Sequence, residues 1–551
     1  MAPRDKVVEF PPPRAAVAPA PSFRLLLRPL PFFVLLFACL TALHASLLRL
    51  PYFWDEAGYY VPAARDLLRG EWIPQFSNAH PPLVMAWLAA WWKVLSFTPL
   101  VTRTAMLVIA AFTLVGVYRL AKVAIGGRET TQREVALASV VCTALFPVFF
   151  AQSSLAQVDL AAAGFTLWAL SFYLEDRLAI AVSLFAFAAV TKETAILAPL
   201  ALLAWEIVQR AFGGPGMNAV RLFPIRPLQR TLALLLPLVP LAAWYAYHYH
   251  RTGYVFGNPE YVRYNIAGTL HPARIAAAAL TRLWHLLGYM NMFVLTIAAA
   301  MAMRLPPQRE VSRGNGRGAV ERARIPLRIQ MVFYAVIAAY VVALSVIGGA
   351  ALARYLLPVY PLVIVLCVAT LRRRLPWWKA FVGVVSLAFV IALVVNPPYR
   401  FAPEDNLDYA TYVRLHQAAE KVLETNYGGR TVLTAWPASD ELAEPFLGYV
   451  QRPARVLAVD DFTAGQMLLA RQEAGRYDVV FAFSTKYEPR LLLQLPFWER
   501  LQERYFGYHR DLPPEAIAQL LGGRLVYVKR DGGQWVAIIA IEHAEEARLS
   551  R

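Results

Sequence analysis

Runs of about 16–22 apolar residues, separated by short basic stretches, recur along most of this 551-residue chain. A helix of about 20 apolar residues is long enough to cross the hydrocarbon core of a membrane. Hydrophobic residues make up 58% of the chain and charged residues only 17%, against about 25% charged in a typical soluble protein. The pattern predicts a polytopic α-helical membrane protein. It excludes a soluble enzyme, a nucleic-acid-binding protein and a disordered chain.

The apolar runs predict about eleven transmembrane helices. Residues 1–28, rich in Pro, Ala and basic side chains, predict a disordered cytoplasmic tail. No small-residue cleavage site follows the first run, so we expect it to be retained as a helix. The segment 81–97 starts with proline and is interrupted by Lys93, which favours an interfacial helix over a span. The predicted spans are 29–50, 99–123, 135–151, 159–174, 178–191, 194–209, 231–248, 281–303, 329–348, 355–371 and 378–396.

Arginine predicts the orientation of these helices. With a cytoplasmic N-terminus, the cytoplasmic loops receive the Arg-dense stretch 304–328 and the cluster 372–374. The outer loops at 51–80, 152–158 and 349–354 receive few positive charges, in agreement with the positive-inside rule. We therefore interpret the net charge of +17 as a topology signal, and we expect no nucleic-acid partner. The prediction is a multi-pass protein of the cell (inner) membrane whose C-terminus lies outside the cytoplasm.

From about residue 400 the composition changes to short β-rich runs that alternate with helical patterns. This alternation predicts a small α/β domain at 400–551, outside the cytoplasm, which follows a membrane part at 29–399. The acidic pair after the second of these runs, Asp460-Asp461, faintly resembles an acidic nucleotide–metal motif, but helix capping by Asp461 explains it, and a nucleotide-sugar donor is not expected outside the cytoplasm. The predicted strands are 430–435, 455–459, 478–483, 525–529 and 535–541, and the predicted helices are 407–425, 463–474 and 489–505.

The first outer loop, 51–98, carries two adjacent carboxylates, Asp55 and Glu56, among several aromatic residues. The pair has two interpretations: an ordinary helix start, with Asp55 as the N-cap, or a catalytic site. His80, followed by two prolines, adds a titratable side chain on a rigid turn at the other end of the first outer loop.

Three further segments place ionisable side chains at the outer membrane boundary. Asp159 stands where the second outer loop enters an apolar helix, a costly place for an unpartnered acid. Lys192 and Glu193 form either a salt-bridged turn or part of a site. Arg354 precedes a proline-broken helix, where a guanidinium either reaches the interface or binds a phosphate headgroup. Carboxylates and cations on one membrane face are what transfer from a lipid-phosphate donor requires, because a carboxylate deprotonates the acceptor while cations stabilise the departing phosphate.

In these residues the chain resembles the GT-C glycosyltransferases of the protein O-mannosyltransferase and aminoarabinose (lipid A) transferase group. The resemblance covers roughly 29–400. It rests on Asp55-Glu56, His80-Pro81-Pro82, Asp159, Lys192-Glu193 and Arg354-Tyr355-Leu356-Leu357-Pro358 with Pro361.

The resemblance implies a GT-C-like fold and an inverting transferase. Such an enzyme moves a sugar, a hexose or a pentose, from a polyprenyl-phosphate donor to an acceptor hydroxyl on the outer membrane face. By position, Asp55 is the catalytic carboxylate, and Glu56 and Asp159 support it or orient the acceptor. The resemblance places the donor phosphate and substrate near His80, Lys192, Glu193 and Arg354, with Tyr59, Tyr60 and Tyr355 lining the pocket.

The sequence departs from the aminoarabinose branch at two places. That branch has Glu-Lys-Pro at the end of the first loop, where this chain has His80-Pro81-Pro82. It also has a Glu-His pair in the long outer loop after the seventh span, where this chain has Glu260-Tyr261 and, nearby, Arg263, a second candidate for phosphate contact. His80 and Glu260 are candidate metal ligands, but two ligands do not make a tetrahedral site. We therefore expect no obligatory cofactor, with a divalent metal as the alternative.

A transporter or lipid flippase without transferase activity is the alternative function. It requires polar residues near mid-span or paired discontinuous helices, whereas the ionisable residues here lie at the outer boundary. A receptor-like protein that uses the spans only as an anchor does not need eleven of them. The acceptor of the predicted transferase is a lipid, a glycan or a protein, and membrane lipids are its other partners.

Overall fold

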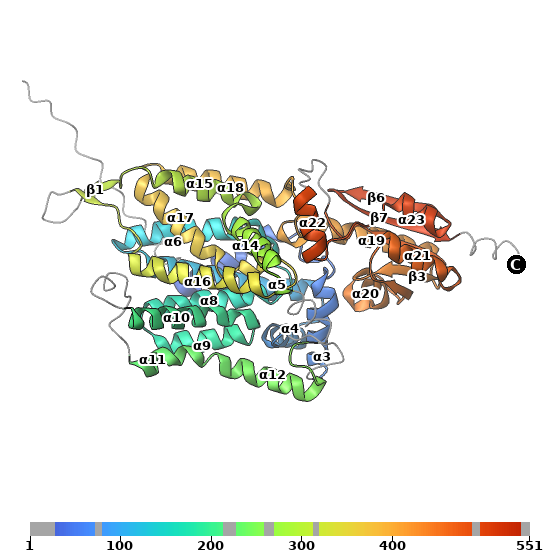
Figure 1. Ribbon diagram of the computed structural model, residues 1–551, viewed down its shortest axis with the longest axis horizontal. Coiled ribbons are helices and arrows are strands. Elements are labelled where there is room, and N and C mark those ends of the chain that lie inside the picture. Colours follow the sequence, from blue (N-terminus) through green and yellow to red (C-terminus); the bar gives the residue numbers. More distant parts are fainter. Residues whose placement is uncertain are drawn as a thin grey trace, which may run out of the picture.

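The computed structural model describes residues 28–71, 80–212, 227–257, 269–311, 319–487 and 496–541. These residues form two parts, a bundle of helices and a smaller C-terminal domain built on a five-stranded sheet (Figure 1). The predicted fold class, a polytopic helical protein with a C-terminal α/β domain, is confirmed.

Every predicted span falls on a helix. Apolar runs form helices in a membrane because only an intrasegment hydrogen-bond ladder satisfies the backbone there. The bundle comprises α2 (Pro29–Leu43), α5 (Pro99–Ala124), α6 (Glu129–Leu145), α7 (Pro147–Gln152), α8 (Asp159–Leu174), α9 (Leu178–Ala189), α10 (Leu197–Ala211), α11 (Leu228–Leu232), α12 (Leu238–Thr252), α14 (Pro272–Leu287), α15 (Met292–Ala302), α16 (Leu327–Val346), α17 (Tyr360–Arg374) and α18 (Trp378–Val394).

Five helical stretches among the described residues are long and apolar enough to cross a membrane. The other predicted runs lie on shorter helices, so length alone does not establish the count of eleven. The five stretches are Pro99–Ala124, Glu193–Ala211, Leu228–Thr252, Pro272–Ala302 and Leu327–Val346.

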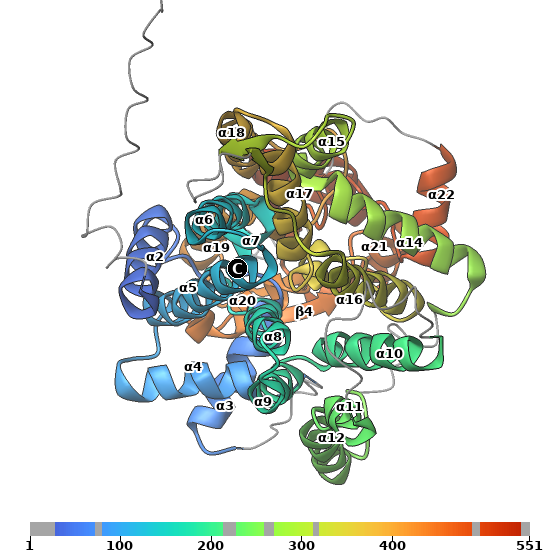
Figure 2. The same cartoon turned by 90° about the vertical axis from the view of Figure 1, so that its left-hand side faces the viewer.

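Two interruptions of predicted spans have a clear local cause. The run 281–303 is divided between α14 and α15, because Met290 and Asn291 adopt left-handed backbone angles (φ 47° and 65°). The run 135–151 is divided between α6 and α7, where Pro147 cannot continue the hydrogen-bond ladder of the preceding helix. Seen along the bundle in Figure 2, α5, α6, α8, α16 and α17 lie centrally, and α12 lies at the edge.

The first outer loop folds into short helices beside the bundle. They are η1 (Glu56–Tyr60), α3 (Val61–Leu68) and α4 (Leu83–Val94). The last of these occupies the segment predicted to be an interfacial helix, and it packs on α3 and α5.

The C-terminal domain has the strand order β4-β3-β5-β7-β6. β3 runs parallel to β4 and β5, whereas β7 is antiparallel to β5 and to β6. All five predicted strands and all three predicted helices are present, and α20 and α23 were not predicted. The elements are α19 (Asp408–Asn426), β3 (Thr431–Ala435), α20 (Ala438–Ala443), β4 (Arg455–Val459), α21 (Ala464–Gln472), β5 (Val479–Phe483), α22 (Pro496–Tyr505), α23 (Pro514–Leu521), β6 (Gly523–Asp531) and β7 (Gln534–Ile541).

The predicted domain boundary at 399/400 falls in the segment between α18 and α19. The short turn η8 (Pro403–Asp405) in this segment packs both on α7 of the bundle and on α19 of the sheet domain, and Glu404 and Asp405 are buried there. This segment therefore connects the two parts.

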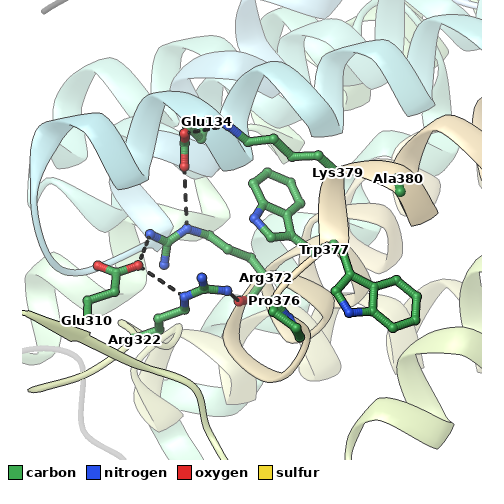
Figure 3. Close-up of a pocket in the computed structure, with 9 residues that line it drawn as sticks. Glu134, Glu310, Arg322, Arg372, Pro376, Trp377, Lys379 and Ala380 are labelled. Carbon is green, nitrogen blue, oxygen red and sulfur yellow. Dashed lines mark hydrogen bonds and ion pairs between the residues drawn. The ribbon is translucent and has the colours of Figure 1, made fainter. Parts of the chain in front are cut away.

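The arginine-rich segments lie at the opposite end of the bundle from the sheet domain (Figure 1). A hairpin of β1 (Arg309–Val311) and β2 (Ala319–Glu321) stands there, next to a cavity of about 390 Å³ (Figure 3). Arg372 pairs with Glu310 at 2.8 Å in this cavity, and Lys379 pairs with Glu134 at 2.7 Å. The cations at this end therefore have acidic partners from neighbouring elements.

Candidate active site

Arg354 is the centre of an ionic cluster at the end of the bundle that faces the sheet domain. It lies in the single turn η7 (Ala353–Leu356), and Pro358 follows between this turn and α17. Its guanidinium contacts three carboxylates from distant parts of the chain. Nη2 donates to Asp55, Nη1 donates to Glu404 at 2.5 Å, and Nε lies 3.5 Å from Asp159.

Asp159 connects this arginine to a second cation. It is the first residue of α8, where the helix dipole favours a negative charge. Lys192, just after α9, donates to Asp159 Oδ1, and its ammonium lies 3.9 Å from the centre of the Tyr355 ring. Arg282 of α14 approaches the same ring at 5.5 Å. Arg354 also lies 5.6 Å from this ring, so three cations surround Tyr355. Two of them, Lys192 and Arg354, share Asp159.

Asp55 is the accessible carboxylate of the cluster. Its side chain is 19% exposed, compared with 2% for Asp159 and 5% for Glu404. It immediately precedes the π-helical turn η1, in the loop that runs beneath the sheet domain. Of the carboxylates that contact Arg354, Asp55 is therefore the best placed to reach an incoming acceptor.

His80 and Glu193 lie next to this cluster. His80 Nδ1 is 2.9 Å from Glu193 Oε2, which joins the end of the first outer loop to the turn after α9. The ring of Tyr60 is buried, 5.8 Å from that of His80, and it is close enough to Asp55 and Arg354 to interact electrostatically with both.

Tyr59, also assigned to the pocket lining, is 45% exposed, and its ring lies 5.8 Å from that of Trp436. Two other assigned residues, Glu260 and Arg263, lie outside the described residues.

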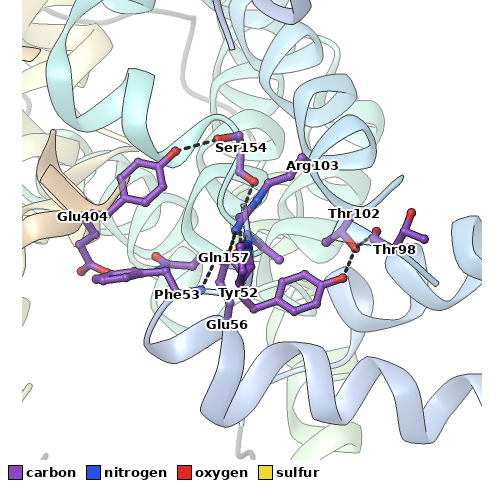
Figure 4. Close-up of polar contacts among 12 residues, drawn as sticks. Tyr52, Phe53, Glu56, Thr98, Thr102, Arg103, Ser154, Gln157 and Glu404 are labelled. Atoms are coloured by element: carbon purple, nitrogen blue, oxygen red, sulfur yellow. Dashed lines mark hydrogen bonds and ion pairs between the residues drawn. The ribbon is translucent and has the colours of Figure 1, made fainter. Parts of the chain in front are cut away.

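Glu56 does not belong to this cluster, which corrects its grouping with Asp55. Its side chain is fully buried and pairs with Arg103 of α5 (Figure 4). It also accepts hydrogen bonds from the backbone N–H groups of Phe53 and Ala156. Glu56 therefore supports the loop that carries Asp55, and it has no route to a substrate.

Glu404 is the member of the cluster that the sequence analysis did not find. Gln157 donates to its carboxylate at 3.1 Å, and burial raises the pKa of Glu404 to about 7, against the opposing effect of Arg354. Burial likewise raises the pKa of its neighbour Asp405 to about 8. The signal in the sequence is the pair Glu404-Asp405, which falls between the last apolar run and the first helix of the sheet domain.

The described residues of the cluster can perform acid–base chemistry beside a phosphate. An accessible carboxylate can accept a proton, and neighbouring cations can stabilise a negative leaving group. The bundle beneath supplies apolar helices between which a lipid tail could lie.

Comparison with known proteins gives consistent results. Residues 79–220 match the model of the dolichyl-phosphate-mannose-protein mannosyltransferase family. The fold is similar to that of ArnT from Cupriavidus metallidurans bound to undecaprenyl phosphate (TM-score 0.52, 14% identity, 92% of this chain and 97% of that chain). The apo state of the same ArnT gives 0.51 and 14%, with 92% and 98% covered. The comparison with curated protein sequences finds no match.

The fold and the family match define a class: the chain is a multi-pass membrane protein with the fold of the GT-C glycosyltransferases. Its segment 79–220 carries the sequence pattern of the dolichyl-phosphate-mannose-protein mannosyltransferase family. The resemblance predicted from the sequence is confirmed.

Proposed function

We propose that this protein transfers a sugar from a polyprenyl-phosphate donor to an acceptor hydroxyl, with inversion at the anomeric carbon. The observation that carries the proposal is the partly exposed carboxylate of Asp55, held by Arg354, which also contacts Asp159. A fixed carboxylate beside a phosphate-binding cation suits deprotonation of a hydroxyl as it attacks.

In the proposed reaction, one oxygen of Asp55 accepts the proton of the acceptor hydroxyl. The acceptor oxygen bonds to the anomeric carbon, and the bond from that carbon to the phosphate oxygen breaks. Polyprenyl phosphate leaves with the bonding electron pair. Because Oδ2 of Asp55 is engaged by Arg354, we assign the proton to Oδ1.

We assign the departing phosphate to Lys192 and Arg354. Both side chains are buried among carboxylates and an aromatic ring, so their charges are less screened than they would be in water. His80, Glu193 and Arg263 are proposed at the edge of the donor site, and Tyr60 and Tyr355 in its wall. The matched ArnT structure is described as bound to undecaprenyl phosphate, which supports a donor of this class.

The reaction so assigned uses cations of the protein, and we propose that it needs no obligatory metal. We further propose that the site faces outward from the cell (inner) membrane, with the N-terminus in the cytoplasm. Arg354 lies just before α17 and the cluster 372–374 ends that helix, so a helix length separates them, and this separation supports that orientation. A lipid, glycan or protein acceptor would then approach between the bundle and the sheet domain.

A donor panel tests the proposal. The purified full-length protein in lipid is incubated with several polyprenyl-phosphate sugars and a membrane extract, and release of free polyprenyl phosphate is followed. Turnover of one donor with sugar transferred to the extract is the expected result, and it identifies the sugar. Movement of donor lipid across the bilayer without release of polyprenyl phosphate would replace the proposal with a flippase.

A further inference from the structure

Three ionisable side chains are buried together in the interior of the C-terminal domain. His416 and Glu420 lie one turn apart on α19, and Glu441 lies on the facing helix α20. One ligand atom from each of the three lies within 4.8 Å of the other two, and all three residues are at most 1% exposed. This buried triad is outside the proposed active site.

The triad has more hydrogen-bonding capacity than its surroundings satisfy. His416 Nδ1 lies 2.6 Å from Glu441 Oε2. Apart from the contact between the two carboxyl groups themselves, both carboxylate oxygens of Glu420, Oε1 of Glu441 and Nε2 of His416 have no hydrogen-bond partner among the described residues. These atoms are buried in one place, where each unsatisfied polar atom costs free energy.

The neighbours of the triad are mainly aromatic. The ring of Tyr412 stacks on His416 at 3.9 Å, and the rings of Phe481 and Phe483 lie 5.1 and 4.7 Å from it. Among the described residues, Glu441 forms a salt bridge with His416 alone. Two carboxylates in such surroundings require a cation or a proton between them, because an isolated buried charge is very costly.

We propose that His416, Glu420 and Glu441 bind a divalent transition-metal ion, with zinc as the best match. Imidazole nitrogen and carboxylate oxygen are both ligand types that zinc accepts in proteins, and three protein ligands leave a fourth position open. The spacing i, i+4 places His416 and Glu420 on one face of α19, and the third ligand comes from a separate element, which gives a buried site. The Tyr412 ring stacks on the imidazole of His416 and restricts its rotation.

The metal would hold α20 against α19 and so position Trp436, which lies two residues before α20 begins. Trp436 precedes α20 and donates a hydrogen bond to Asp440 at 3.0 Å. Its indole packs on the loop of Asp55 so closely that a Cβ placed on Gly58 would lie 2.7 Å from it. The ion would therefore act structurally, by fastening the sheet domain to the loop that carries the proposed catalytic carboxylate.

A second cluster, Asp461, His509 and Asp511, has the same ligand types but a different environment. It is partly exposed, and its aspartates accept hydrogen bonds from Thr463 N and Thr485 Oγ1. The bond to Asp461 is a local turn contact and the bond to Asp511 joins two loops, so these carboxylates already have partners and the cluster serves as an internal comparison for the buried triad.

The test measures metal in the full-length protein, purified in detergent without chelator from cells grown with zinc. The variants are His416→Gln and Glu420→Gln, with Glu424→Gln as the matched control on the same helix. Glu424 accepts backbone hydrogen bonds from Gln451 and Arg452, which a glutamine oxygen can also do. Elemental analysis gives the zinc content, and amide exchange at residues 52–60 reports the loop next to Trp436.

We expect about one zinc per chain in the wild type and in Glu424→Gln, and a loss of that equivalent in the two triad variants. Removing the zinc from the wild type should accelerate amide exchange at residues 52–60, and adding ZnCl₂ should reverse the change. A wild-type protein that contains no zinc and takes up none when ZnCl₂ is added would overturn the proposal, since a shared proton would then neutralise the triad. Full zinc content in both triad variants would overturn it as well.

Should the triad variants fail to fold, the wild type alone decides the question. Cobalt substituted for zinc in the wild type should give the visible absorption of a low-symmetry N/O site, and X-ray absorption should detect a single histidine ligand. A spectrum with sulfur ligands, or with more than one histidine, would place the metal elsewhere and contradict the assignment.

Discussion

Glu56→Ala should destabilise the first outer loop strongly, although Glu56 adjoins the proposed catalytic Asp55. Both Glu56 and Arg103 are fully buried, and the glutamate also accepts two backbone hydrogen bonds. Its removal leaves the guanidinium with only the carbonyl groups of Pro51 and Ser154, each at 2.9 Å. Removing one partner of a buried ion pair typically costs about 3–5 kcal/mol.

The loss should be visible as faster amide hydrogen exchange of the full-length protein in detergent. About 3–5 kcal/mol corresponds to roughly 150- to 5,000-fold faster exchange, because each 1.4 kcal/mol is a factor of ten. The effect should be confined to residues 52–60 and 154–157, which the glutamate ties together. Asp55→Ala is the neighbouring control and should change exchange much less, because Arg354 keeps its contacts with Asp159 and Glu404.

A double variant separates the lost charge balance from the lost contact. Glu56→Gln leaves an uncompensated buried cation, and adding Arg103→Met removes that cation, so the double variant should regain part of the protection. Unchanged exchange in Glu56→Ala together with abolished turnover would refute the reasoning and return Glu56 to the chemistry.

Three further predictions concern the cluster itself. Arg354→Lys should lower turnover by about 10²-fold or more, because one ammonium cannot contact three carboxylates as the planar guanidinium does; wild-type turnover would contradict the central role of Arg354. Lys192→Met should raise the KM for the donor and lower kcat, whereas a change confined to acceptor kinetics would move Lys192 away from the phosphate. With a pKa of about 8, folded Asp405 binds a proton that the unfolded chain loses near pH 4, so stability should fall as pH rises between these values, by at most about 1.4 kcal/mol per pH unit. Asp405→Asn should flatten the dependence of Tm on pH between pH 5 and 9. If Tm of the variant fell as steeply with pH as that of the wild type, the titrating group would be another residue.

Much of the fold follows from local patterns in the sequence. An apolar run of about 20 residues can satisfy its backbone in lipid only as a helix, so each predicted span lies on one. The strands of the C-terminal domain follow from a different local pattern. Runs of β-branched and aromatic residues, such as Val479–Phe483, fit a pleated sheet. The break at Met290 was not predicted, because a run of apolar residues does not specify backbone angles.

The site was only partly predictable. Asp55, Asp159, Lys192 and Arg354 were found because a charged side chain at a membrane boundary is conspicuous among apolar neighbours. The different roles of Asp55 and Glu56 depend on which way each side chain points, and this is set by Arg103, far away in the sequence. Glu404 was missed because its importance lies in long-range contacts, with Arg354 and Gln157, that no local pattern reveals.

The most direct test of the central claim compares Asp55→Asn with the wild type on the donor that the panel identifies. Asparagine keeps the shape of the side chain but removes its charge and its capacity as a base, so turnover should fall by about 10²–10⁴-fold. Asp66→Asn, an equivalent change in the same outer loop, should retain wild-type turnover. If Asp55→Asn turned over donor as fast as the wild type, the assignment of Asp55 as the catalytic carboxylate would be contradicted.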